Sequence, residues 1–205
     1  MTGGVRRAPV QRRSVERFER LLDACAALLA EVGHDALTTR GVAQRAGVPI
    51  GTLYQFFDGK TGLLQALAAR NLELLLARVR ERLAGEAVGD WGEAAVLVYD
   101  EILAMRRVLP GFFVADPRDG SPYDADIVRR ADTAMAGELY ALGLREAGLP
   151  PLPDPERVLL VAITSTDGVL RLAFQTHEDG DAAVIALGAR LLRAYFGEIA
   201  HPGIT

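Results

Sequence analysis

Hydrophobic side chains recur every three or four residues along most of the chain, which is the spacing of one face of an α-helix. The first such stripe covers residues 18–32, and Gly33 is placed to end that helix. Two short helices are expected next, one beginning after the N-cap Thr38 and one over about residues 50–56 with Pro49 at its first position. Because no segment has the pattern of a β-strand, the sequence predicts an all-α fold.

Longer helices are expected after the turn at Asp58-Gly59. They cover about residues 60–83, 91–108, 123–147, 155–176 and 181–199. Asp154 is placed to cap the helix that begins at residue 155, and the prolines just before it exclude a helix there. This order predicts a small N-terminal head of three helices, followed by a larger helical bundle.

The composition is that of a folded, water-soluble protein, since hydrophobic residues make up 50% of the chain and charged residues 24%. The single cysteine, Cys25, cannot form an internal disulfide, which favours a reducing compartment. No run of apolar residues approaches the roughly 18–20 that a membrane span requires. We therefore expect a cytoplasmic protein without a membrane segment.

Charge is distributed unevenly along the chain. Residues 1–60 hold nine basic and six acidic side chains, which gives them a net charge of +3. Because the whole chain has a net charge of −4, residues 61–205 have a net charge of −7. A basic head on an acidic body is expected when only the head meets a polyanion, although an excess of this size can also arise by chance.

One segment carries a much more specific signal. Residues 20–64 are RLLDACAALLAEVGHDALTTRGVAQRAGVPIGTLYQFFDGKTGLL. This segment resembles the N-terminal signature of the TetR family: a helix ending at Gly, a Thr-capped helix with a Val-Ala pair, Ala-Gly-Val, and a short helix with Thr, Leu, Tyr and Phe. A Lys opening a long helix completes the pattern. Ile50 and Gly41 depart from the residues usual in the family, which puts the operator sequence in doubt but not DNA binding.

The resemblance implies a helix-turn-helix head, in which two short helices meet at a tight turn and the second one enters the major groove. Its core is expected to combine Ala43, Val48, Leu53 and Phe57 with apolar residues of the first helix. Residues expected to contact phosphate are Thr38, Thr52, Tyr54 and Lys60, the one lysine of the chain. Residues expected to contact bases are Thr39, Arg40, Pro49, Ile50, Gly51 and Gln55.

By the same resemblance, the bundle binds a small apolar effector and forms a homodimer. Two recognition helices about 34 Å apart then reach successive major grooves of a palindromic operator. Candidate ligand-lining residues are Trp91, Tyr99, Met105, Phe112, Phe113, Met135, Tyr140 and Phe174. Candidate dimer-interface residues are Ser165, Gly168, Leu187, Leu191, Tyr195 and Phe196. The polar run over residues 164–167 can either orient a ligand or form hydrogen bonds at the dimer interface.

We accordingly divide the chain into a flexible basic arm (1–13), a helix-turn-helix DNA-binding domain (14–60) and a ligand-binding and dimerisation domain (61–205). The arm either reaches a flanking groove or is a free tail. The predicted function is a ligand-responsive DNA-binding transcriptional regulator, a repressor released from its operator by its effector.

The sequence leaves two alternatives to a DNA-binding regulator. A helical protein–protein adaptor would share the fold without binding DNA. An all-helical enzyme is less favoured, because the sequence lacks nucleophile and phosphate-loop motifs, and its three histidines have no metal-ligand spacing. We expect no cofactor, no metal ion and no catalytic residue.

Overall fold

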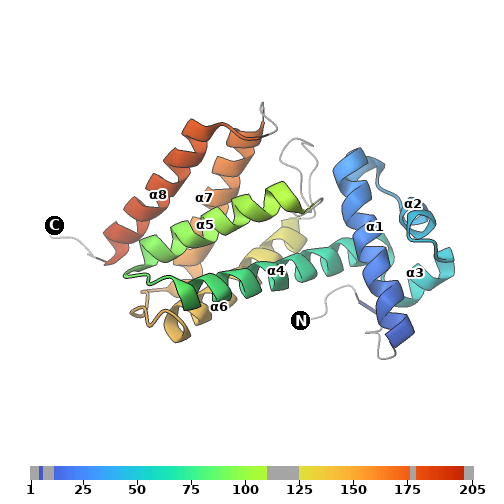
Figure 1. The fold of residues 1–205 in the computed structure, drawn as a ribbon, viewed down its shortest axis with the longest axis horizontal. Coiled ribbons are helices and arrows are strands. Elements are labelled where there is room, and N and C mark those ends of the chain that lie inside the picture. Colours follow the sequence, from blue (N-terminus) through green and yellow to red (C-terminus); the bar gives the residue numbers. More distant parts are fainter. Residues whose placement is uncertain (1–4, 7–11, 110–124, 176–178, 201–205) are drawn as a thin grey trace. The chain divides into compact units, whose positions relative to one another are not determined.

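The computed structural model of the chain describes residues 5–6, 12–109, 125–175 and 179–200, and these residues form helices and a single isolated β-bridge (Figure 1). The helices are α1 (Arg12–Ala36), α2 (Thr39–Arg45), α3 (Ile50–Phe56), α4 (Gly59–Gly85), α5 (Trp91–Val108), α6 (Ala125–Arg145), α7 (Pro155–Phe174) and α8 (Ala182–Ala200). The all-α prediction is therefore confirmed, with helix bounds within a few residues of those expected from periodicity.

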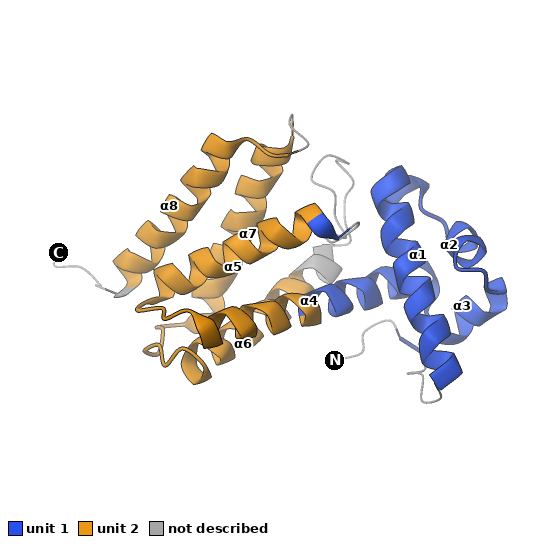
Figure 2. Ribbon diagram, in the orientation of Figure 1, with its two compact units in different colours: residues 1–72, 108–123 blue, residues 73–107, 124–205 orange. Residues whose placement is uncertain are grey.

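The chain divides into two compact units, shown in different colours in Figure 2. Unit 1 comprises Met1–Leu72 and Val108–Tyr123, and unit 2 comprises Glu73–Arg107 and Asp124–Thr205. The division falls inside α4, between Leu72 and Glu73, whereas the sequence suggested a boundary at residue 60.

Local sequence explains how the helices of unit 1 end. Gly33 takes a left-handed φ of 74°, which interrupts α1 before its last residues. Thr38 is the N-cap of α2, as predicted, and its Oγ1 accepts a hydrogen bond from the Gly41 amide at 3.0 Å. Pro49, expected at the first helical position, is instead the N-cap of α3, because its ψ of 140° is extended rather than helical.

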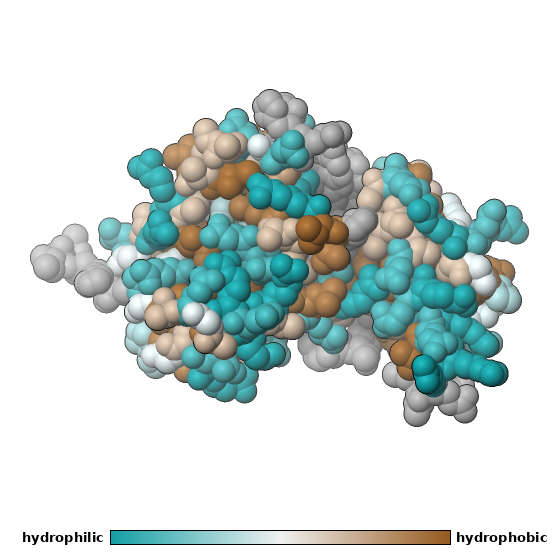
Figure 3. Space-filling model, in the orientation of Figure 1, coloured by the Kyte–Doolittle hydropathy of each residue, from teal (hydrophilic) through white to brown (hydrophobic). Residues whose placement is uncertain are grey.

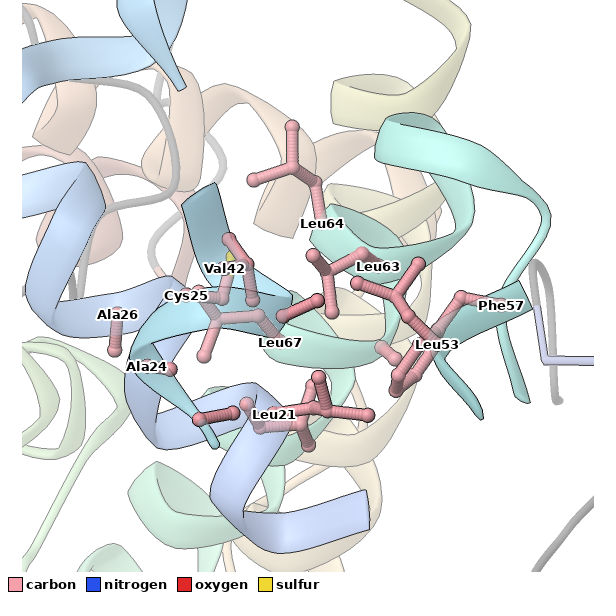
Figure 4. Packing of buried hydrophobic residues seen from close by; sticks show 14 of the residues in the cluster. Leu21, Ala24, Cys25, Ala26, Val42, Leu53, Phe57, Leu63, Leu64 and Leu67 are labelled. Carbon is pink, nitrogen blue, oxygen red and sulfur yellow. The ribbon is translucent and has the colours of Figure 1, made fainter. Parts of the chain in front are cut away.

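The core of unit 1 is built from apolar side chains of four helices and the turn between α2 and α3. Figure 4 shows the labelled side chains of α1, α2, α3 and α4 gathered around Leu53 and Leu67. Leu21, Cys25, Val42, Leu53 and Phe57 are at most 1% exposed. The core predicted from the sequence, including Ala43, Val48 and Phe57, is confirmed. Gly47 makes the α2–α3 turn possible with a φ of 64°.

Part of the N-terminal arm is attached to this unit. Val5 forms the β-bridge with Phe57, and the Arg6 amide donates to the Phe56 carbonyl oxygen at 2.8 Å. The Arg6 guanidinium also pairs with the Asp58 carboxylate at 2.6 Å. The sequence left open whether the arm contacts a flanking groove or is a free tail. Residues 5–6 of this arm are held against unit 1, because the strand-like pairing satisfies backbone groups that would otherwise bond water.

In unit 2, α7 packs against both α6 and α8. Asp181 caps α8, with its Oδ1 accepting from the amides of Ala183 at 2.8 Å and Val184 at 3.2 Å. Asp154 precedes α7 as expected, but its φ of 43° turns its side chain away from capping, and it pairs with Arg157 instead. Among the residues that are described, none of the helices could cross a lipid bilayer.

Candidate nucleic-acid interface and ligand cavity

The short helix α3 has one face in the core and one face in solvent. Leu53 and Phe56 are buried, and their packing fixes the helix on α1 and α4. Along the opposite face Pro49, Gly51 and Gln55 are exposed. Two further side chains on that face, Ile50 and Tyr54, are large and hydrophobic yet 39% and 45% exposed. Apolar surface left open on a rigid seven-residue helix indicates a contact surface.

Helix α2 contributes its N-terminal end to the same region. Thr39 Oγ1 lies 3.2 Å from the Tyr54 hydroxyl, within hydrogen-bond distance, so the start of α2 is joined to the exposed face of α3. Arg40, the next residue, is exposed, and Thr52 is half-buried on α3. The structure therefore brings the predicted phosphate-contacting and base-contacting residues of both helices onto one connected surface.

Lys60 has a structural contact that the sequence did not predict. Its ammonium donates to the backbone carbonyl oxygen of His34, near the C-terminal end of α1. Cations are favourable at this end of a helix, because the last carbonyl groups lack partners within the helix. An ammonium group has three donors, so this bond leaves two donors for another acceptor.

The basic side chain of Arg45, at the end of α2, is engaged within the head. It forms two hydrogen bonds with Glu31 of α1, one of 2.7 Å from Nη2. This hydrogen bonding lowers the pKa of the Glu31 carboxyl group, which stays ionised beside the guanidinium. The pair ties α2 to α1, although the Arg45 side chain, like that of Arg40, is exposed.

Unit 2 encloses a small cavity of about 70 Å³ between α4, α5, α6, α7 and α8. Its wall is almost entirely apolar. The lining residues are Val79, Leu83, Trp91, Ala94, Ala95, Val98, Tyr99, Ile102, Met135, Leu139, Leu142, Gly143, Leu159, Ala162, Ile163, Thr166, Asp167, Leu192 and Phe196. An apolar cavity with few polar groups is the usual form of a small-molecule site in a protein.

The candidate ligand residues separate into three groups. Trp91, Tyr99 and Met135 line the cavity. Tyr140 stacks on Trp91 at 5.7 Å between ring centroids, whereas Met105 and Phe174 are buried in the core outside the lining. Phe112 and Phe113 lie outside the described residues.

Two polar residues of the lining, Thr166 and Asp167, belong to the polar run over residues 164–167. From the sequence, this run could either orient a ligand or form hydrogen bonds at the dimer interface. Burial raises the pKa of Asp167 to about 6, with the nearby acid Asp132 adding to the effect and Arg171 opposing it. The sequence signal for this site was a carboxylate in an otherwise apolar helix. Only the packing of α7 shows that the Asp167 side chain lines the cavity.

The exposed side of α7 and α8 carries hydrophobic side chains. Leu187 and Leu191 are 57% and 48% exposed, and Val161 and Leu172 of α7 are 45% and 59% exposed. Hydrophobic surface is visible over these two helices in Figure 3. Of the smaller candidates, Gly168 is exposed and Ser165 is half-buried.

Two of the candidate interface residues point inward. Phe196 is only 2% exposed, lines the cavity and stacks on Trp91 at 6.4 Å between ring centroids. Tyr195 is half-buried and its hydroxyl donates to the Val158 carbonyl oxygen at 3.0 Å. The expectation that Phe196 lies on a subunit surface is wrong for this chain, because α8 is apolar on two sides and Phe196 belongs to the inner one.

Comparison with a protein-family model places residues 21–67 in the family described as "Bacterial regulatory proteins, tetR family". The HTH-type transcriptional repressor KstR of Rhodococcus jostii is 44% identical over 63 residues, which cover 31% of this chain and 30% of the relative. The class D tetracycline repressor protein of Escherichia coli is 46% identical over 54 residues, 26% of this chain and 25% of the relative. The matches to these curated relatives thus span about a third of their length or less.

Solved structures extend the likeness to most of the chain. A TetR-family transcriptional regulator from Streptomyces coelicolor has 44% sequence identity and a TM-score of 0.77, with 89% of this chain and 99% of that chain covered. The fatty acid degradation regulator FadR from Bacillus halodurans has 16% identity and a TM-score of 0.64, with 92% and 97% covered, and shows a shared fold only.

Proposed function

Because this chain belongs to the TetR family of bacterial transcriptional regulators, we propose that it is a transcriptional repressor that binds operator DNA through the exposed face of α3. The proposal rests on the two faces of this short helix. Leu53 is buried and fixes α3 in the core, whereas Ile50, Tyr54 and Gln55 are exposed on the other side. A helix held this firmly can enter a major groove about 12 Å wide without losing its own packing.

The proposed contacts divide by chemistry. Gln55 can bond adenine through both the oxygen and the NH2 group of its side-chain amide, Arg40 can bond guanine, and Ile50 with Pro49 can contact a thymine methyl group. Thr39 and Gly51 are the remaining base-contacting candidates. Thr38, Thr52, Tyr54 and Lys60 would contact phosphate oxygens and fix the position of the head on the duplex, without selecting a sequence.

We further propose that two chains associate through the exposed apolar side of α7 and α8, where Leu187 and Leu191 lie in solvent. A symmetric pair presents two heads to two half-sites, so the operator would be palindromic. We also propose a cytoplasmic location, because a DNA-binding regulator has its target there.

The cavity of unit 2 is the proposed site of a small, mainly apolar effector. At about 70 Å³ it is smaller than typical ligand sites, so an effector has to separate the surrounding helices to enter. An effector that binds the DNA-free conformation more tightly lowers the affinity for DNA by the same free energy, which would release the repressor.

The test is a titration of a labelled DNA fragment from upstream of the protein's own gene with the full chain. Binding is measured by fluorescence anisotropy at several salt concentrations. We expect saturable binding that weakens steeply with salt, because bound phosphates release counterions. Indifference to DNA at low salt would contradict the proposal and favour a protein–protein adaptor.

A further inference from the structure

The wall of the cavity in unit 2 is apolar except at one place. Among its described lining residues, Asp167 is the one that carries a charge, and none is Lys, Arg or His. A carboxylate ligand or another anion would therefore enter a site that offers it a negative charge and no basic partner.

The aromatic members of the wall have their own polar ends satisfied elsewhere. The Trp91 indole N–H donates to the Pro150 carbonyl oxygen at 2.7 Å, and the Tyr99 hydroxyl donates to the Ile185 carbonyl oxygen at 3.2 Å. These two residues consequently line the cavity with ring surface, which attracts cations as well as apolar groups.

Asp167 differs from these aromatic residues. Within the described part of the chain, its carboxylate has no hydrogen bond and no ion pair. Two charged groups act on its pKa: Asp132 of α6, which has the same sign, and Arg171, which is exposed and offsets the effect of burial only in part. The charge of this partly buried carboxylate is therefore compensated incompletely, and a bound cation would supply a direct positive partner.

We propose that the cavity of unit 2 binds an amphipathic organic amine, with the apolar body between α5, α6 and α8 and the ammonium group at Asp167. This inference rests on the proposed role of unit 2 as the effector-binding part of the regulator, and it names the chemical class of the effector. The Thr166 hydroxyl, also in the wall, lies beside Asp167 in the chain and provides a second polar contact for the ammonium group.

The experiment uses three probes that share one skeleton and differ only in the head group: 4-phenylbutylamine, 4-phenylbutanol and 4-phenylbutanoate. Trp91 is the one tryptophan of the chain and lines the cavity, so its fluorescence reports binding to the full-length protein directly. At about pH 8 the amine is protonated and Asp167 is ionised, because its pKa is about 6.

We expect the amine to bind about tenfold more tightly than the alcohol, and the anion to bind most weakly. In Asp167→Asn the ratio of amine to alcohol affinity should fall to about one, whereas Asp167→Glu, which keeps the charge, should retain a preference for the amine. Glu156→Gln removes a carboxylate from an exposed position of the same helix and should leave the ratio as in the parent protein.

Equal affinity for amine and anion, a preference unchanged in Asp167→Asn, or no binding of any probe would each overturn the assignment. Repeating the titrations with the operator fragment separates it from the proposed function. A protein that prefers the amine but never binds DNA contradicts the repressor role alone, and a DNA-binding protein without the preference contradicts the cavity assignment alone.

Discussion

The hydroxyl groups of Thr39 and Tyr54 lie 3.2 Å apart, so the first residue of α2 is joined to the middle of α3 on the solvent side of the head. Both residues were expected from the sequence to contact DNA, but their mutual contact was not. This pairing holds the Tyr54 ring in position at 45% exposure, with its hydroxyl available to a phosphate oxygen as well.

Replacing Tyr54 with Phe removes the hydroxyl and keeps the ring. We expect DNA affinity to fall several-fold for every sequence, since one hydrogen bond contributes about 0.5–1.5 kcal/mol and phosphate contacts do not select bases. Anisotropy titrations with operator and scrambled DNA measure this. The salt dependence is the internal control and should not change, because no charge is removed; an unchanged affinity for both DNAs would contradict the role of Tyr54.

Lys60 combines a structural bond with a proposed DNA contact, and two substitutions separate these roles. Lys60→Gln keeps a donor that can reach the His34 carbonyl group but removes the charge. We expect near-parental thermal stability with a salt slope reduced by about one unit per subunit. Lys60→Ala should reduce the slope equally and also lower the melting temperature, because the end of α1 loses its cap. An unchanged slope in both variants would show that Lys60 serves only the fold.

Much of the head could be predicted from sequence because its signals are local. The Thr38 cap and the apolar spacing of α1 act within a few residues of one another, and both were confirmed. The bond from Lys60 to His34 spans 26 positions in the chain, and no local pattern encodes it. Likewise Val5 finds its partner, Phe57, only once α3 is in place.

In unit 2 the limits of prediction have another cause. Helix α8 has apolar side chains on two sides, so the spacing of its apolar residues does not predict whether Phe196 or Leu191 is exposed. The structure puts Phe196 at 2% exposure and Leu191 at 48%. Asp167 stood out as a polar residue in an apolar helix, but the direction of its side chain depends on how α6 and α7 pack.

Gly143 is required by the position of Trp91. A Cβ atom at residue 143 would lie 2.3 Å from the nearest atom of the indole ring, closer than any real contact. Gly143→Ala should therefore displace Trp91, reduce the free energy of unfolding by about 1–3 kcal/mol and shift the tryptophan emission. Gly137→Ala, in the same helix and with nothing within 4 Å, is the matched control and should not destabilise the protein. Equal stability of both variants would contradict this packing.

The raised pKa of Asp167 has a consequence for stability. In the folded protein this pKa is about 6, above the ordinary value of 3.8 for an aspartate, so the folded state holds the proton more tightly and loses relative stability as pH rises through this interval. Asp167→Asn removes that dependence. We expect the variant and parent to be similar below about pH 4, and the variant to be more stable by about 1 kcal/mol above pH 7, a value reduced for partial solvent access. Chemical denaturation at both pH values measures the difference, and a parent protein that gains stability relative to the variant as pH rises would contradict the sign.

The proposed repressor role depends on base recognition by Gln55 and its neighbours on α3. Its most direct test is selection of bound sequences from a random DNA pool by the parent protein and by Gln55→Ala, with Tyr54→Phe as the control. We predict a palindromic site for the parent, a changed preference at one position of each half-site for Gln55→Ala, and the parental site at lower affinity for Tyr54→Phe. Recovery of the same site at the same affinity by Gln55→Ala would exclude base recognition by this side chain.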